Sequence, residues 1–312
     1  ARLLFLQVVR HEDLAAQSES NRTAIVPIVP NRGLILDRNG VVLATNYAAY
    51  TLEITPSRAG VLDETIDGLS KVVEIQSRDR RRFKRLMEES RNFESLPIRT
   101  RLTDEEVARF TAQRYRFPGV DIKARLFRNY PLGEVASHAI GYIGRINQAE
   151  KARIQDSDDE ANYRGTEYIG KLGIEQSYEA ALHGATGVEQ METSAGGRAV
   201  RKLSSRAATP GDSVMLSIDI KLQKLIEELY GSRRGALVAI DPRNGEILAL
   251  VSKPTFDPNL FVEGIDVENW AALNESIDKP LLNRALRGTY PPGSTYKPFM
   301  AMAALATGKR SA

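Results

Sequence analysis

The chain has 312 residues, a formal net charge of +3, 42% hydrophobic residues and 27% charged residues, which is the balance of an ordinary globular protein long enough for two domains. The small positive charge is below that of a dedicated nucleic-acid binder, so we expect no nucleic-acid partner. The absence of cysteine excludes disulfides and thiolate metal sites, and the three histidines are scattered, so we expect no metal and no cofactor.

Residues 1–9 are apolar but far too short to span a bilayer, and no signal-peptide pattern is complete there. They are either the start of an ordinary amphipathic helix or a stub that follows a membrane anchor. The residues alone do not decide between the two.

The first strong structural signal is the Asn39-Gly40 pair, which lies between two apolar runs and predicts a β-hairpin. Arg32, Asp37 and Arg38 bracket the predicted turn. These three charged residues form either a surface ion network or a structural contact at a domain joint.

Residues 62–117 are predicted to be mostly helical and are highly charged. The densest basic run, residues 78–85, has acidic residues on both sides and apolar residues at helical spacing. This pattern favours a solvated helix face over a nucleic-acid site. Thr103 and Glu106 are spaced as a capping box, which predicts the start of a helix.

Residues 118–150 return to strand and turn character, and His138 is predicted to pack in the interior. Residues 170–184 predict a short helix that ends at a glycine. Glu175 and Glu179 are one helical turn apart in it. We assign them to structural salt bridges, because the paired carboxylates of a glycoside hydrolase face each other across a cleft.

The best candidate for a domain boundary is the Thr-Pro-Gly-Asp sequence at residues 209–212. Beyond it, residues 214–218 predict a strand, and Asp219 caps a predicted helix. The apolar face of that helix comprises Leu222, Leu225, Ile226 and Leu229. Two apolar runs, residues 236–240 and 246–252, are joined by a loop with a glycine and predict a second hairpin.

Near the C-terminus, two prolines and a glycine precede Ser294, and the apolar run at residues 299–306 predicts a buried helix. Pro298 requires this helix to begin within about one turn before it. Ser294 then lies at the helix N-terminus, beside free backbone N–H groups, with Lys297 on the same face. A serine becomes a nucleophile when a base takes its proton, and a partly buried lysine can be that base.

The S-x-x-K spacing is a weak signal alone, because about one chance match is expected in a chain of this length. A second match, Ser276 and Lys279, has no Pro-Gly break before it and is followed by a proline in a polar loop. We interpret this second match as the chance one. On spacing alone, Ser294 and Lys297 also fit an N-cap serine and a solvated lysine.

Longer strings resemble one known family. Residues 284–298 resemble the active-site region of class B penicillin-binding proteins, for which S-x-x-K is a signature. Residues 32–44 are similar to the first motif of the non-catalytic pedestal of that family, and residues 169–175 and 258–262 look most like its elongation-specific branch. The resemblance covers the chain from about residue 20 to its end.

The resemblance implies a mixed α+β fold, in which an elongated non-catalytic pedestal, with a β-rich anchor and a helical head, precedes the N-terminal part of a penicillin-binding transpeptidase α/β domain. We expect a juxtamembrane stub at residues 1–20, the pedestal at 21–208 and the transpeptidase part at 209–312. The family carries an N-terminal membrane anchor, which is absent from this chain. The implied location is the bacterial inner membrane, crossed once, with the globular part in the periplasm.

The implied activity is that of a D,D-transpeptidase, which cross-links peptidoglycan stem peptides during cell elongation through an acyl-serine intermediate. Ser294 would be the nucleophile and its backbone N–H an oxyanion donor, with Lys297 as the general base. β-Lactams would acylate Ser294. The implied protein partners are a RodA-type SEDS glycan polymerase and the scaffold MreC.

The sequence departs from the family in one respect. The family needs two further motifs downstream of the serine, and this chain has no K-T-G or K-S-G and no S-x-N after Ser294. We therefore expect that this 312-residue piece alone does not turn over substrate. The alternatives are a non-catalytic pedestal module that docks and activates a glycan polymerase, and a β-lactamase or penicillin sensor that shares S-x-x-K.

Overall fold

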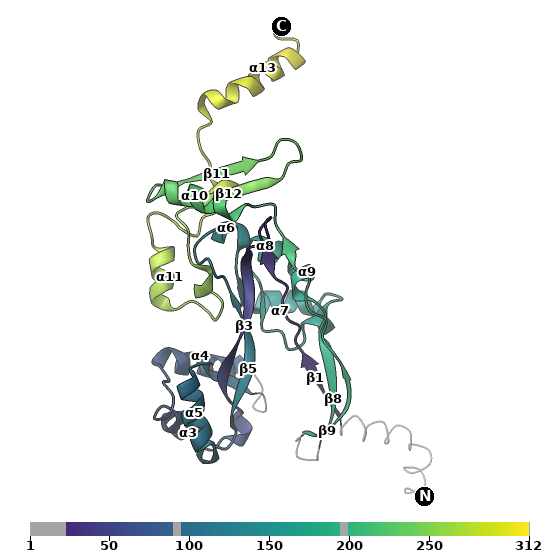
Figure 1. The fold of residues 1–312 in the computed structure, drawn as a ribbon, viewed down its shortest axis with the longest axis vertical. Coiled ribbons are helices and arrows are strands. Elements are labelled where there is room, and N and C mark those ends of the chain that lie inside the picture. The colour runs from purple at the N-terminus through teal and green to yellow at the C-terminus, as the bar shows by residue number, and fades with distance from the viewer. Residues whose placement is uncertain (1–22, 90–94, 194–198, 312) are drawn as a thin grey trace, which may run out of the picture.

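The computed structural model describes residues 23–89, 95–193 and 199–311. It is a mixed α/β chain drawn out along one axis, with a helical head at one end and the last helix at the other (Figure 1). The predicted juxtamembrane stub at residues 1–20 lies outside the described residues. Within the described ranges, every helix is too short or too polar to cross a membrane.

A long antiparallel spine runs through the lower half of the molecule (Figure 1). Strand β3 (Val42–Ile54) pairs with β5 (Val120–Asn129) over ten residues and with β4 (Leu96–Leu102) near its end. The short strand β2 (Ile35–Leu36) forms a hairpin with β3, and Gly40 in its turn has a φ of +82°. The hairpin predicted from Asn39-Gly40 is therefore confirmed.

The head is formed by α3 (Leu62–Leu69), α4 (Ser77–Glu89) and α5 (Asp104–Gln113), with β4 and the short 3₁₀ turns η2 (Pro56–Arg58) and η3 (Arg114–Arg116). Thr103 and Glu106 make both hydrogen bonds of the predicted capping box at the start of α5. The three helices cover a closed apolar cluster. Its most deeply buried members include Leu52, Ile54, Leu69, Phe83, Ile98 and Phe110. The mostly helical character predicted for residues 62–117 is confirmed. The strand β4 lies within this range and was not predicted.

The rest of the pedestal, called the anchor here, holds two smaller sheets beside β2 and β3. One is formed by β1 (Thr23–Ile28), β8 (Gly187–Thr193) and β9 (Ala199–Arg206), and the other by β6 (Ile143–Arg145) and β7 (Tyr168–Gly170). The helical elements of the anchor are α6 (Ser137–Ile140), α7 (Gln148–Gln155), η4 (Glu160–Tyr163), α8 (Gly173–Ser177) and α9 (Glu179–His183). The single helix predicted at residues 170–184 is thus two helices that meet at Tyr178, and the chain leaves α9 at Gly184 with a φ of +82°.

The C-terminal part follows the predicted order of strand, helix and hairpin. Its elements are β10 (Val214–Met215), α10 (Ile220–Tyr230), β11 (Gly235–Ile240), β12 (Ile247–Lys253), η5 (Pro258–Leu260), α11 (Val267–Asn274), α12 (Arg284–Arg287), η6 (Gly293–Tyr296) and α13 (Lys297–Ala306). The strand predicted at residues 214–218 is shorter than expected, and it pairs in parallel with β2 of the anchor. The second hairpin is confirmed as β11 and β12.

The buried face of α10 is only partly apolar, with Ile220 buried and Leu222 and Ile226 half-buried. Asp219 caps this helix as predicted, but Leu225 and Leu229 are 52% and 65% exposed. The buried positions include Gln223 and Glu227. Gln223 bonds the N–H and C=O of Leu250 on β12, at 2.8 Å each, and donates to Glu227 at 2.8 Å. These bonds keep Gln223 and Glu227 on the buried side, because a buried polar group without a partner is costly.

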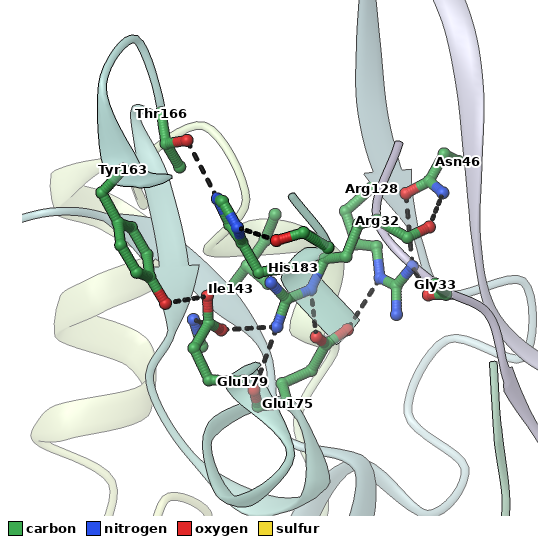
Figure 2. Close-up of polar contacts among 12 residues, drawn as sticks. Arg32, Gly33, Asn46, Arg128, Ile143, Tyr163, Thr166, Glu175, Glu179 and His183 are labelled. Atoms are coloured by element: carbon green, nitrogen blue, oxygen red, sulfur yellow. Dashed lines mark hydrogen bonds and ion pairs between the residues drawn. The ribbon is translucent and has the colours of Figure 1, made fainter. Parts of the chain in front are cut away.

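A buried ion network joins three segments of the anchor that are far apart in sequence (Figure 2). The two oxygens of the Glu175 carboxylate accept from Arg128 Nε and Arg32 Nε, at 2.7 Å each, and Arg128 and Glu175 are fully buried. Arg32 also donates to Glu179 at 2.6 Å, and Arg128 donates to the carbonyl oxygen of Gly33 at 2.7 Å. The assignment of Glu175 and Glu179 to structural salt bridges is confirmed.

We predict that Glu175→Gln lowers the free energy of unfolding by about 3–5 kcal/mol, because it leaves two buried arginines without their shared charge. Urea denaturation followed by circular dichroism measures this loss. The matched control is Glu192→Gln, which breaks the exposed pair with Arg201 and is expected to cost less than about 1 kcal/mol. Equal losses in the two variants would contradict the structural role of the network.

Candidate active site

The segment around the predicted nucleophile is a 3₁₀ turn that runs into a helix. Gly293 opens it with a φ of +56°, which favours glycine. The backbone N–H of Lys297 bonds the carbonyl oxygen of Ser294, and α13 begins at Lys297. Pro298 is then in the first turn of α13, where the missing N–H of proline costs little. The prediction that the helix begins within a turn of Pro298 is confirmed.

No hydrogen bond joins the Ser294 and Lys297 side chains in the described part of the chain. Both residues are exposed, and among the described residues neither side chain has a hydrogen bond or an ion pair. Their spacing of three residues across the start of α13 leaves them near each other along the chain. Their chemical roles therefore stay predictions.

The burial predicted for the apolar helix at residues 299–306 is wrong for this structure. The helix exists as α13, but its large apolar side chains are exposed, with Phe299 at 64% and Met302 at 67%. Burial of a helix that is apolar on most sides needs a layer of protein against it. The described residues place no such layer on α13, which extends away from the body of the molecule (Figure 1).

The second S-x-x-K match lies in a turn rather than at the start of a helix. The Ser276 hydroxyl accepts from the backbone N–H of Asp278 at 3.2 Å, and Lys279 has a φ of +44°. Ser276 and Lys279 are therefore not arranged like Ser294 and Lys297. This agrees with our interpretation of the second match as a chance one.

Asp37 connects the first hairpin to α10, the first helix of the C-terminal part. Its fully buried carboxylate accepts backbone N–H groups of Asn39 and Val41 at 2.8 Å each, within the hairpin turn, and of Ile220 at 3.2 Å, at the start of α10. Burial alone would raise the pKa of Asp37, but these hydrogen bonds outweigh it and lower the pKa. The sequence allowed either a surface ion network or a structural contact at a domain joint for this charged cluster. Asp37 forms the structural contact.

Arg38 and Arg32 differ in their roles: Arg38 forms a surface ion pair, and Arg32 forms a structural contact in the interior. The Arg38 guanidinium lies 3.5 Å from Glu246 at the surface, and its backbone N–H bonds the carbonyl oxygen of Ile218. Arg32 belongs to the buried network around Glu175. Only the Arg38 side chain thus matches a surface ion pair.

A second connection across the joint was not anticipated from the sequence. The Asn259 side chain accepts from the backbone N–H of Tyr130 at 2.9 Å and donates to its carbonyl oxygen at 3.0 Å. In addition, the backbone N–H of Ala136 donates to Glu227 at 3.0 Å. These residues are more than ninety positions apart in each pair, so no local pattern could reveal them.

His138 is an interior residue, as predicted. Its Nε2 lies 2.8 Å from the carbonyl oxygen of Pro280, and its ring packs edge-on against Phe256. Burial lowers the pKa of His138 to about 4. Across the described ranges there is no cluster of His, Asp or Glu that could hold a metal ion.

Two family models match the chain. The model of the penicillin-binding protein dimerisation domain matches residues 27–216, and the model of the penicillin-binding protein transpeptidase domain matches residues 235–312. The domain boundaries that we placed at residues 20 and 209 stay predictions.

The chain is also similar to individual proteins. It is 44% identical over 308 residues to the peptidoglycan D,D-transpeptidase MrdA of Escherichia coli K12, and 43% identical to the Acinetobacter baumannii protein of the same name, with 99% of this chain and 49% and 45% of those proteins covered. The chain thus spans about half the length of the curated relatives it matches. A solved complex of penicillin-binding protein PBP2 and MreC from Helicobacter pylori matches with a TM-score of 0.76 at 30% identity, covering 91% of this chain and 52% of that one.

We predict that Asp37→Asn destabilises the chain by about 1–3 kcal/mol at pH 7, because it removes a buried carboxylate that accepts backbone N–H groups. Since the pKa of Asp37 is lowered on folding, its stabilisation is complete above the unfolded pKa of about 4 and is lost as the pH falls through the folded value. The difference in unfolding free energy between wild type and variant should therefore shrink below pH 4. Urea denaturation between pH 7 and pH 3 measures it, with the exposed Asp158→Asn as control.

Proposed function

Because the chain belongs to the class B penicillin-binding proteins, we propose that it supplies the pedestal and the nucleophile segment of a peptidoglycan D,D-transpeptidase active in cell elongation. The observation that carries this proposal is the S-x-x-K sequence at a glycine break where a 3₁₀ turn becomes a helix. The pedestal fold and the similarity to D,D-transpeptidases at 43–44% identity support it.

In the proposed reaction, Ser294 Oγ attacks the carbonyl carbon of the D-Ala–D-Ala bond, and its proton passes to Lys297. The oxygen that becomes negative is stabilised by the backbone N–H of Ser294, at the positive end of the helix. The C–N bond breaks, the leaving D-alanine takes a proton, and an ester to Ser294 remains. An amine of a neighbouring stem peptide then attacks this ester, which forms the cross-link and frees Ser294. A β-lactam would acylate the same hydroxyl.

The proposed base must be neutral to accept a proton, and desolvation is what favours a neutral lysine. Lys297 is exposed among the described residues. We therefore propose that the active state has a further layer of protein over α13. The exposed apolar side chains of Phe299, Met300 and Met302 suit such a layer.

We further propose that the pedestal docks MreC and a RodA-type glycan polymerase at the periplasmic side of the inner membrane. A single N-terminal membrane-spanning segment would hold the protein there. The support for MreC is the similar PBP2 that was solved in complex with it. A candidate surface is the exposed face of the spine, where Tyr50 and Leu126 are 46% and 50% exposed on adjacent strands. Apolar cross-strand side chains left in water are typical of docking faces.

We predict that the natural polypeptide in which this chain occurs forms one covalent adduct with a fluorescent penicillin, on Ser294. Ser294→Ala should abolish the adduct. Lys297→Ala should slow acylation by about 10²–10⁴-fold, which is the usual contribution of a general base. Gel fluorescence and peptide mass spectrometry measure both effects.

The matched controls are Ser276→Ala and Lys279→Ala, because they change the other S-x-x-K match, which lies in a turn. Both should label like the wild type. An adduct that survives Ser294→Ala would place the nucleophile elsewhere and sink the proposed chemistry.

For the docking surface, we predict that Leu126→Glu weakens binding of the periplasmic part of MreC by at least about tenfold, because a charge replaces an apolar contact. Surface-immobilised chain and soluble MreC give the affinity. The control is Ser294→Ala, which should bind MreC unchanged because it lies outside the pedestal. Wild-type affinity in Leu126→Glu would exclude this face.

A further inference from the structure

An arginine-lined cleft lies between the head and the C-terminal part. It has a volume of about 530 Å³ and is walled by α4 and β4 on the head, by residues 145–147 and by residues 259–267, which include the start of α11. In Figure 1 the head helix α4 faces α11 across this region. Neither the S-x-x-K segment nor the mechanism proposed for it uses this cleft.

The charge of the cleft is strongly positive. Seven of its lining residues are arginines, against the three acidic residues Asp79, Glu263 and Asp266. Three of the arginines, Arg78, Arg81 and Arg85, have no ion-pair partner among the described residues. Their spacing places them on one face of α4. Like charges gathered on one face repel one another unless an anion lies between them.

The other four arginines of the cleft are engaged by acidic side chains of the protein. Arg82 and Arg101 lie 3.5 Å and 2.7 Å from Glu263. Arg99 lies 3.9 Å from Glu106, and Arg145 lies 3.4 Å from Glu167. The unpaired positive charge of the cleft is therefore on α4.

Glu263 shows that the arginines of the cleft bind a carboxylate. Its carboxylate comes from the C-terminal part and lies 2.7 Å from Arg101 and 3.5 Å from Arg82, and it accepts from the Thr100 hydroxyl at 2.5 Å. Arg101 is held there with a φ of +53°, a strained value for a residue with a side chain. The head therefore already binds one carboxylate, and the unpaired arginines of α4 remain for others.

The size and walls of the cleft indicate a peptide rather than a simple ion. A volume of about 530 Å³ is within the range of about 300–1,000 Å³ that small-molecule ligands occupy. Apolar side chains line it beside the arginines, among them Leu86, Ile146, Leu260 and Val267. We propose that this cleft binds a short peptide that carries two or more carboxylates. Acidic stem peptides would belong to this class, and that last link alone rests on the proposed function.

The test is isothermal titration calorimetry of the 312-residue chain with the acetylated and amidated peptide Glu-Glu-Glu. We expect binding that weakens as salt is raised, because ion pairs at an open cleft are screened. The double variant Arg81→Gln with Arg85→Gln should weaken it by about tenfold or more. Both arginines are exposed and unpaired in the described chain, so the variant should keep its circular dichroism spectrum.

The controls isolate the cleft and the chemistry of the ligand. Arg109→Gln makes the same change on the exposed face of α5, outside the cleft, and should leave the affinity unchanged. The neutral peptide Gln-Gln-Gln should not bind. The proposal is overturned if the acidic peptide gives no binding at millimolar concentration, if Arg109→Gln weakens binding as much as the double variant, or if the neutral peptide binds equally.

An inorganic anion is distinguished in a separate arm. Pyrophosphate that binds more tightly than the acidic peptide and displaces it would identify a phosphate site and overturn the assignment to a carboxylate peptide. Labelling of Ser294 by a fluorescent penicillin is an independent readout, so failure of this proposal and failure of the proposed function can be told apart.

Discussion

One carboxylate shared by two arginines is the contact on which the rest of the pedestal depends. Glu175 is fully enclosed, so its charge is tolerable only while both guanidinium groups are in place. Those groups come from the segment before the first hairpin and from the end of β5. The requirement for charge neutrality inside the anchor thus fixes three distant segments at once. Asp37, in the hairpin that follows Arg32, then fixes the start of α10 by accepting the backbone N–H of Ile220.

Local patterns predicted the local structure well. Asn39-Gly40 predicted the turn because glycine adopts the positive φ that the turn needs at Gly40, and Thr103 with Glu106 predicted a helix start because their side chains replace missing backbone partners. The burial of the charged residues near this turn could not be predicted from local patterns. The sequence could not separate Asp37, which is buried, from Arg38, whose side chain is at the surface, because the difference lies in what folds against them.

The two helices whose burial differs from the prediction have one thing in common. Hydrophobicity alone predicts that the leucines of α10 and the apolar run of α13 face the interior, yet α10 turns Gln223 inward and α13 is exposed. Which face of a helix is buried depends on its neighbours, and these neighbours are remote in sequence. The basic run on α4 is a similar case. It does form a solvated helix face, but that face borders a cleft whose other wall begins about 180 residues later.

The Gln223 amide has an effect on how the β11–β12 sheet can grow. It hydrogen-bonds both the N–H and the C=O of Leu250 on the side of β12 away from β11. On the same side, the N–H of Asp219 donates to the C=O of Leu248. That border of the sheet is therefore closed to strand addition, which protects it from unwanted association. At the other border, the C=O of Ala236 on β11 accepts from the Tyr230 hydroxyl at 2.8 Å. The helix α10 therefore places a side chain on both borders of this sheet, Gln223 on β12 and Tyr230 on β11.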